Sequence, residues 1–156
     1  MSSASLFFFL LAKKKVLLRS YLKGENIMLK KTVTYVDFDG ETRTETHYFN
    51  LTKRDLLKLQ SEYPGGLHKL LMKIIAENDN KRIFEYMEDI VQRSYGEKSA
   101  DGRSHIKNQK VLDAFIHTEA YSQLIVELAT NADAATEFIN GIIPESIVKE
   151  TAAEAH

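Results

Sequence analysis

The sequence predicts an α+β domain in which an N-terminal β-hairpin packs on a bundle of five or six short helices. Residues 29–50 show a two-residue period of Thr, Val, Tyr and Phe, interrupted by a turn signal at Asp39-Gly40. Residues 52–143 instead place apolar side chains at helical spacing in short runs. The chain has 156 residues, of which 44% are hydrophobic and 28% charged, a composition typical of one soluble globular domain.

The hairpin turn determines which side chains we expect to face the helices. A two-residue turn at Asp39-Gly40 would pair Val33 with Thr46. Side chains alternate between the two faces of a strand, so this register also assigns the inner face. We expect the face that covers the helices to carry Leu29, Val33, Tyr35, Thr44 and Tyr48.

Capping and breaking residues delimit the expected helices. The first helix begins at Thr52, with Asp55 in the position of a capping-box partner, and ends before Pro64-Gly65-Gly66. Thr118 and Asn131 are the expected caps of the last two helices. The intervening residues 95–103 have no hydrophobic period and contain two glycines, which predicts a loop. The helical apolar runs after the first helix cover residues 67–75, 83–91, 111–115, 120–128 and 132–143.

The chain divides into three segments by composition. The apolar run 6–12 is too short to span a bilayer, and its lysines follow it rather than precede it as in a signal peptide. The codons of Lys23-Gly24-Glu25 can spell a ribosome-binding site just before Met28. We therefore expect residues 1–27 to be a spurious or disordered leader, residues 28–144 to form the domain, and residues 145–156 to be a polar tail.

Charge and cysteine content exclude several classes of function. The chain has no cysteine, which excludes disulfides, thiolate zinc sites, iron–sulfur clusters and a cysteine nucleophile. Residues 28–156 contain 16 basic and 21 acidic side chains, a net charge of −5. Such a domain repels phosphate backbones, and no apolar run is long enough to cross a membrane. We expect neither a nucleic acid nor a membrane as a partner.

No catalytic or cofactor-binding pattern is recognisable in the sequence. The five histidines are scattered without metal-ligand spacing, and Gly65-Gly66 lacks the context of a phosphate-binding loop. We expect a protein that is not an enzyme and that binds neither cofactor nor metal. One basic cluster, formed by Arg103, His105 and Lys107, could hold a phosphate or an acidic partner, although a solvated loop is the favoured interpretation.

Five segments of the sequence carry a resemblance to a known family. They are THYFNLTK at 46–53, YPGGL at 63–67, SYGEKSADGR at 94–103, TEAY at 118–121 and FINGIIP at 138–144. In these segments the chain resembles the tail assembly chaperones of long-tailed bacteriophages and prophages of Gram-positive bacteria. None of the segments is a catalytic signature.

The resemblance implies a small, non-catalytic protein of the host cytoplasm that is absent from the mature virion. It implies binding to the long, largely helical tape-measure protein, which is kept soluble while tail-tube subunits assemble around it. In related phages a ribosomal frameshift adds a domain that recruits tail-tube protein. Two alternatives stay open: a structural tail-tube or connector component retained in the virion, and a small nucleic-acid-binding regulator.

Surplus apolar side chains are the candidates for partner binding. Methionine and tyrosine suit adaptable contacts, because both present large apolar surfaces that accept different neighbours. Core packing is the competing interpretation for each of them, and self-association of the chain is left open. The candidates are Met72, Tyr86, Tyr95 and Tyr121, together with Arg103 from the basic cluster.

Overall fold

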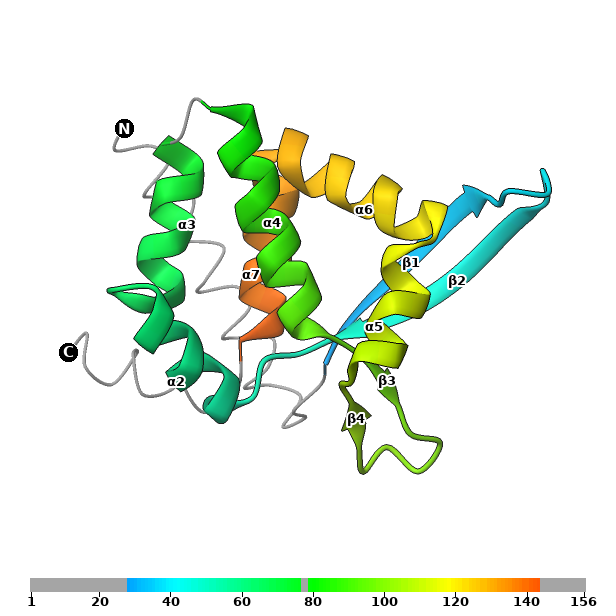
Figure 1. The fold of residues 1–156 in the computed structure, drawn as a ribbon, viewed down its shortest axis with the longest axis horizontal. Helices are drawn as coiled ribbons and strands as arrows, with labels where there is room; N and C mark the ends of the chain where they lie inside the picture. The colour runs from blue at the N-terminus through cyan, green and yellow to red at the C-terminus, as the bar shows by residue number, and fades with distance from the viewer. Residues whose placement is uncertain (1–27, 77–78, 144–156) are drawn as a thin grey trace, which may run out of the picture.

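A four-stranded antiparallel sheet and six helices make up residues 28–76 and 79–143, the part of the chain that the computed structural model describes (Figure 1). The strands lie in the order β1 (Leu29–Val36), β2 (Thr42–Phe49), β3 (Tyr95–Lys98) and β4 (His105–Ile106). The helices are α2 (Lys53–Glu62), α3 (Gly66–Ala76), α4 (Asn80–Ser94), α5 (Gln109–Ile116), α6 (Glu119–Thr130) and α7 (Ala132–Ile142). The predicted α+β class, a hairpin packed on short helices, is confirmed.

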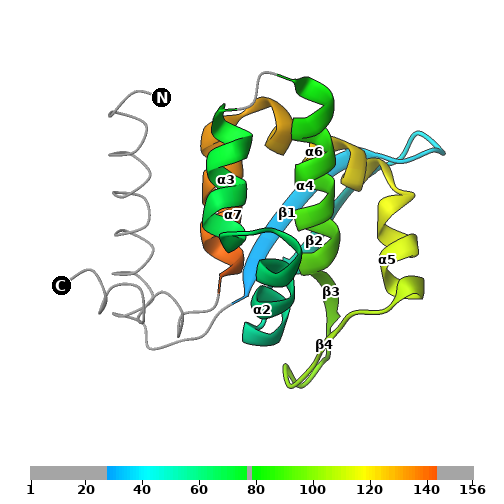
Figure 2. The same cartoon turned by 60° about the vertical axis from the view of Figure 1, so that its left-hand side comes forward.

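The helices gather around one end of the β1–β2 hairpin. Helices α3, α4 and α7 lie side by side, and α6 and α7 both contact β1 (Figures 1 and 2). The other end of the hairpin projects past α6 into solvent (Figure 1). The hairpin therefore has an end near the helices, residues 29–31 and 47–49, which we call the proximal half. Residues 32–46 form the distal half, which projects and contains the turn at residues 37–41.

The core consists of the apolar stripes that the helical spacing predicts, closed by the inner face of the hairpin. Its fully buried side chains come from both ends of the chain, with Phe49 of β2 and Phe138 of α7 in edge-on ring contact at 5.1 Å. Burial of this apolar surface is the main source of stability. The other large, fully buried side chains are Leu51, Leu59, Leu70, Met87, Ile90, Leu124, Leu128, Ile139 and Ile142.

The expected register of the hairpin is wrong by one residue. Val33 pairs with Glu45 rather than with Thr46. The turn contains residues 38–40 instead of two residues, and it closes with Gly40 at a φ of 82°. A three-residue turn that ends in a left-handed glycine is the next most common way to connect two antiparallel strands.

The corrected register changes the inner face of β2. Thr44 and Tyr48, which we expected on the inner face, lie on the opposite one, because a shift of one residue moves every side chain of a strand to the other side. Thr44 instead joins Thr34 across the outer face through their hydroxyls, 3.0 Å apart. The inner face carries Leu29, Val33, Tyr35, His47 and Phe49.

The expected loop at residues 95–103 is wrong in its first four residues, whereas residues 99–103 form a turn. Its first part forms β3, which pairs with β2 through Tyr48 opposite Gly96 and Phe49 opposite Tyr95. After a turn, β3 pairs with the short strand β4. The segment lacks a strand signal of its own because it is short and polar, and it becomes a strand only beside the edge of β2.

The helix boundaries follow the predicted caps. Thr52 and Asp55 form a reciprocal capping box at the start of α2, with hydrogen bonds of 3.2 and 2.9 Å. The hydroxyl of Thr118 accepts from the amide of Tyr121, and the side chain of Asn131 accepts from the first turn of α7. The expected leader 1–27, Pro144 and the tail 145–156 lie outside the described residues.

Candidate functional site

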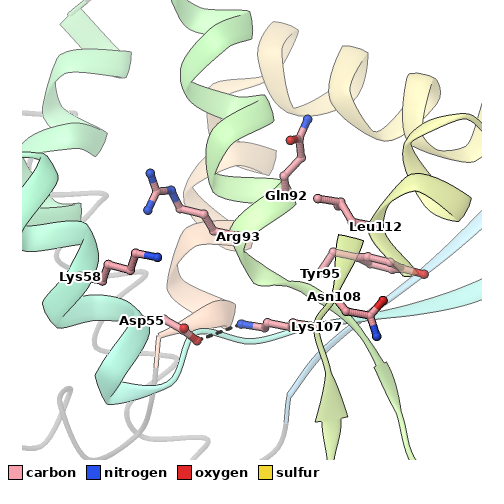
Figure 3. A pocket seen from close by; sticks show the side chains of 8 residues that line it. All are labelled: Asp55, Lys58, Gln92, Arg93, Tyr95, Lys107, Asn108 and Leu112. Atoms are coloured by element: carbon pink, nitrogen blue, oxygen red, sulfur yellow. Dashed lines mark hydrogen bonds and ion pairs between the residues drawn. The ribbon is translucent and has the colours of Figure 1, made fainter. Parts of the chain in front are cut away.

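Two clefts flank α4, and the first lies between α2, α4 and α5. Its volume is about 240 Å³. Figure 3 shows side chains from α2 on one side, from α4 above, and from the β4–α5 connection and α5 on the other. The lining residues are Asp55, Lys58, Gln92, Arg93, Tyr95, Lys107, Asn108 and Leu112.

An ion pair ties the two sides of this cleft together. The ammonium group of Lys107 donates to Asp55 Oδ2 at 2.9 Å (Figure 3). It also donates to the carbonyl oxygen of Asn50 at 2.7 Å. Burial alone raises the pKa of Asp55, but its hydrogen bonds with Thr52 and Lys107 outweigh that effect and lower it. Lys107 therefore holds the start of α2 against the β4–α5 connection, which is a structural role.

A second charged group closes the upper part of the same cleft. The guanidinium of Arg93 donates to Asp89 Oδ1 at 2.8 Å and also contacts Glu62 on α2. Asp89 accepts in addition from the hydroxyl of Tyr63 at 2.8 Å, and burial together with this carboxylate raises the pKa of Tyr63 to about 12. The first cleft is thus largely occupied by the ion pairs that fasten α2 to α4.

Aromatic rings lie behind the first cleft. Tyr95 stacks on Phe115 of α5 with ring centroids 4.1 Å apart. His47 of β2 contacts the same Phe115 at 4.7 Å, and its Nε2 atom is buried without a hydrogen-bond partner among the described residues. Burial lowers the pKa of His47, because the imidazolium form loses its hydration there. This aromatic cluster fixes the proximal half of the hairpin to α5.

The second cleft, which we call the α3–α4 cleft, is open and basic. Its volume is about 320 Å³, and its lining residues are Lys73, Ala76, Arg82 and Tyr86. Met72 lies four residues before Ala76 on α3 and hence on the same helical face. The cleft combines the half-buried ring of Tyr86 and the exposed Ala76 with two exposed cationic side chains, Lys73 and Arg82.

The predicted contact residues lie in different parts of the described chain. Tyr86 lines the α3–α4 cleft and Tyr95 lines the first cleft, whereas Met72 is half-buried on α3, outside the residues that line either cleft. Arg103 is exposed in the β3–β4 turn. Tyr121 is only 7% exposed, and its hydroxyl joins Gln92 and Glu88 inside the molecule. Their roles in partner binding stay predictions.

The basic cluster seen in the sequence does not form a patch. Lys107 is paired with Asp55, as described above. The ring of His105 is half-buried, and its Nε2 atom lies 3.1 Å from the carbonyl oxygen of Tyr48. Of the three side chains, only that of Arg103 is turned to solvent without such a contact to the body of the domain. The cluster therefore offers no concentrated binding site for phosphate.

Charge is segregated between two regions of the described chain. Residues 53–76 and 79–82 carry seven basic side chains against Asp55, Glu62 and Asp79. Helices α5–α7 carry Lys110 alone against five acidic side chains. The α3–α4 cleft lies on the basic side of the described chain, because Lys73 and Arg82 are among its lining residues.

Metal and membrane sites find no support among the described residues. Within that part of the chain, no three His, Asp or Glu side chains are grouped so that they could hold a metal ion. No helix among residues 28–76 and 79–143 is long and apolar enough to cross a membrane.

Comparison with known families decides the class of this protein. Residues 28–156 match the family model for phage tail assembly chaperones. The chain belongs to the phage tail assembly chaperone family. No curated protein and no solved structure matches it significantly. The resemblance seen in the five sequence segments is thereby confirmed, and the protein is assigned to the assembly of phage tails.

Sequence reasoning missed the two clefts of this chaperone. The first cleft depends on a contact between Lys107 and Asp55, which are 52 residues apart in the chain, and local sequence patterns do not predict such a contact. The basic character of the α3–α4 cleft could have been predicted from the seven basic side chains of α2, α3 and the start of α4. The whole-chain net charge of −1 conceals them.

Proposed function

We propose that this tail assembly chaperone binds the tape-measure protein of its phage and keeps that protein soluble while the tail is built. The single observation that carries the proposal is the family match over residues 28–156. Membership in a tail assembly chaperone family makes tail proteins the expected partners and makes binding, rather than catalysis, the expected activity. A long helical protein that waits for its tube subunits exposes apolar surface and needs such protection.

The binding surface in this proposal is the α3–α4 cleft. Met72 and Tyr86 supply apolar contacts, while Lys73 and Arg82 supply charge at the margins. A helix that places apolar residues along one stripe and acidic residues beside it would fit such a surface. The first cleft is less suitable, because the Lys107–Asp55 and Arg93–Asp89 ion pairs already occupy its polar groups.

Co-expression tests the binding activity. The full chain is produced together with the long helical open reading frame downstream in its operon, and both the soluble yield and the co-purification of the long protein are measured. We expect the long protein to become soluble and to co-purify with the chaperone. A long protein that stays insoluble and unbound contradicts the proposal.

Point variants locate the surface. We expect Met72→Glu and Tyr86→Gln to weaken binding of the long protein by at least about tenfold, because Tyr86→Gln removes an apolar contact from the cleft and Met72→Glu places a charge one helical turn before Ala76 of its lining. The matched control is Val126→Glu on α6, which alters another apolar side chain that is 48% exposed but lies outside the cleft. Equal binding by all three variants would place the partner elsewhere on the domain.

Mass spectrometry of purified virions separates the chaperone from a structural component. A protein that acts in the host cytoplasm and is then released should be missing from finished particles. A tail-tube or connector component should instead be present at the copy number of the other tail proteins. Detection at that level would replace the chaperone proposal with the structural alternative.

A further inference from the structure

The outer edge of β2 is open over five residues. β3 pairs with β2 only at Tyr48 and Phe49, so among residues 28–76 and 79–143 the stretch Thr42–Thr46 has a strand neighbour on one side alone, β1. The side chains from Thr42 to Thr46 are all exposed. An exposed edge of this kind presents a row of backbone N–H and C=O groups that can pair with another strand.

The hairpin register identifies which backbone groups point outward. The amide of Asp37 donates to the carbonyl of Glu41 at 2.9 Å, so the odd-numbered residues of β2 direct their backbone groups toward β1. The even-numbered residues point the other way, as Tyr48 shows by pairing with β3. Thr42, Thr44 and Thr46 therefore direct their amides and carbonyls to the open side.

We propose that this edge pairs antiparallel with the same edge of a second copy of the chain, about a two-fold axis at Thr44. In that register, Thr44 exchanges hydrogen bonds with Thr44 of the second copy. Thr42 of each copy exchanges hydrogen bonds with Thr46 of the other. Every outward-pointing backbone group of the open stretch is then paired, and the two hairpins form one continuous sheet.

The charges of Arg43 and Glu45 favour this register over the two in which the two-fold axis is shifted by one residue. Pairing about Thr44 places Arg43 of each copy opposite Glu45 of the other, at Cβ separations of about 4.5–5.5 Å. A shift of the two-fold axis to Arg43 or to Glu45 would place like charges directly opposite one another, which destabilises a strand pair. The Arg43 side chain is 55% exposed and contacts Asp37 of its own chain, and Glu45 accepts a hydrogen bond from Tyr35.

The length of the open stretch limits the strength of the contact. From Tyr48 onward β3 occupies the edge, so the paired segment cannot extend beyond Thr46. Such a short ladder buries less surface than a stable interface, and we expect a weak dimer that forms with rising concentration. This inference does not depend on the proposed function, because a monomeric chain could still bind a tape-measure protein.

The oligomeric state of the full chain provides the first test. Sedimentation velocity is measured over a concentration series up to about 1 mM, where even a weak association becomes visible. We expect a reversible monomer–dimer equilibrium. A chain that is monomeric throughout the series overturns the proposal. If that monomer instead binds an extended segment of a tail protein at this edge, the occupant of the edge is the tail protein and not a second copy.

Charge-exchange variants test the register. In R43E, positions 43 and 45, which face each other across the two copies, both carry carboxylates, and in E45R both carry cations. We therefore expect each variant alone to dimerise at least about tenfold more weakly than the parent chain. An equimolar mixture restores opposite charges across the axis and should dimerise again. A mixture that stays as weakly associated as its components overturns the antiparallel register.

A proline pair controls for the stability of the hairpin itself. In Thr44→Pro the lost amide hydrogen faces the open edge, so the β1–β2 bonds are retained while the dimer contact is blocked. Thr34→Pro is the matched control, since Thr34 lies opposite Thr44 and its amide faces the other side of the hairpin. We expect only Thr44→Pro to abolish the dimer, and equal effects of the two variants overturn the proposal.

Discussion

The two halves of the β1–β2 hairpin differ strongly in how their side chains are buried. In the proximal half, Phe49 is fully buried and contacts rings from β3, α5 and α7. In the distal half, Phe38 is 77% exposed and Val36 55% exposed, and every residue of β2 from Thr42 to Thr46 is exposed. The hairpin is therefore part of the core at one end, whereas at the other end β2 and the turn project from the domain and only Val33 and Tyr35 of β1 stay buried.

This difference shows how a small domain can offer strand edges without losing stability. The proximal half is fastened from several directions by apolar contacts, so the distal half can carry polar residues on its outer face and along β2, while Val33 and Tyr35 of β1 stay buried on its inner face. Turn chemistry and threonine pairs maintain the shape of the arm, since Thr32 and Thr34 contact Thr46 and Thr44 through hydroxyls 3.0 Å apart. Substitutions in the two halves should therefore have very different costs.

The largest effect is expected for Phe49→Ala in the proximal half. Removal of a fully buried ring leaves a cavity among Tyr95, Phe115 and Phe138, and we expect a loss of about 3–5 kcal/mol in the free energy of unfolding. Urea denaturation followed by circular dichroism measures it. A loss below about 1 kcal/mol would show that the proximal half is not the anchor of the hairpin.

Gly96→Ala should have the next largest effect, because it disturbs the junction of β2, β3 and β4. A Cβ atom at this position would lie 2.8 Å from His105 Nε2 and 2.8 Å from the carbonyl oxygen of Ile106. We expect a destabilisation of about 1–3 kcal/mol, since a backbone group has to move. Gly40→Ala in the distal turn is the control: its Cβ meets nothing within 4 Å, so only the cost of its φ of 82° remains, about 1 kcal/mol. A smaller loss for Gly96→Ala than for Gly40→Ala would contradict this ranking.

A pH dependence should distinguish the halves as well. Burial lowers the pKa of His47 in the proximal half below its ordinary value of 6.5, so the unfolded chain binds the proton more readily than the folded one. The corresponding stability is complete above pH 6.5 and is lost as the pH falls through the folded-state pKa. His105 is shifted in the same direction, first by burial.

The variant His47→Phe tests this assignment. Phenylalanine keeps a ring against Phe115 and Tyr95 but cannot be protonated. Urea midpoints measured between about pH 7.5 and pH 5 should fall less steeply for the variant than for the parent chain. Parallel pH profiles of the two proteins would show that His47 is not responsible for the loss.

The smallest effect is expected for Thr34→Ala in the distal half. The substitution removes one hydroxyl contact between exposed threonines, and exposed cross-strand pairs contribute little. We expect a change of about 0.5 kcal/mol or less in the free energy of unfolding, measured in dilute solution. A loss comparable to that of Phe49→Ala would remove the distinction between anchor and arm.

Local signals predicted part of the fold well, and non-local contacts account for the errors. The caps Thr52, Thr118 and Asn131 were predictable because each bonds to the next turn of its own helix. The hairpin register was not, since an Asp-Gly pair is compatible with both a two-residue and a three-residue turn. Of the candidate contact residues, Tyr121 shows why composition alone is insufficient, because burial depends on which helices pack around it.

The sequence by itself determined the fold class, the helices with their caps, and membership in the tail assembly chaperone family. These properties depend on residues close together in the chain or on the identity of short segments. Only the tertiary structure decided that residues 95–98 become a strand, that Lys107 meets Asp55, and that β2 keeps an open edge. The physical reason is that these features depend on which surfaces remain unpaired after the core has formed, and that is decided by contacts between residues far apart in the chain.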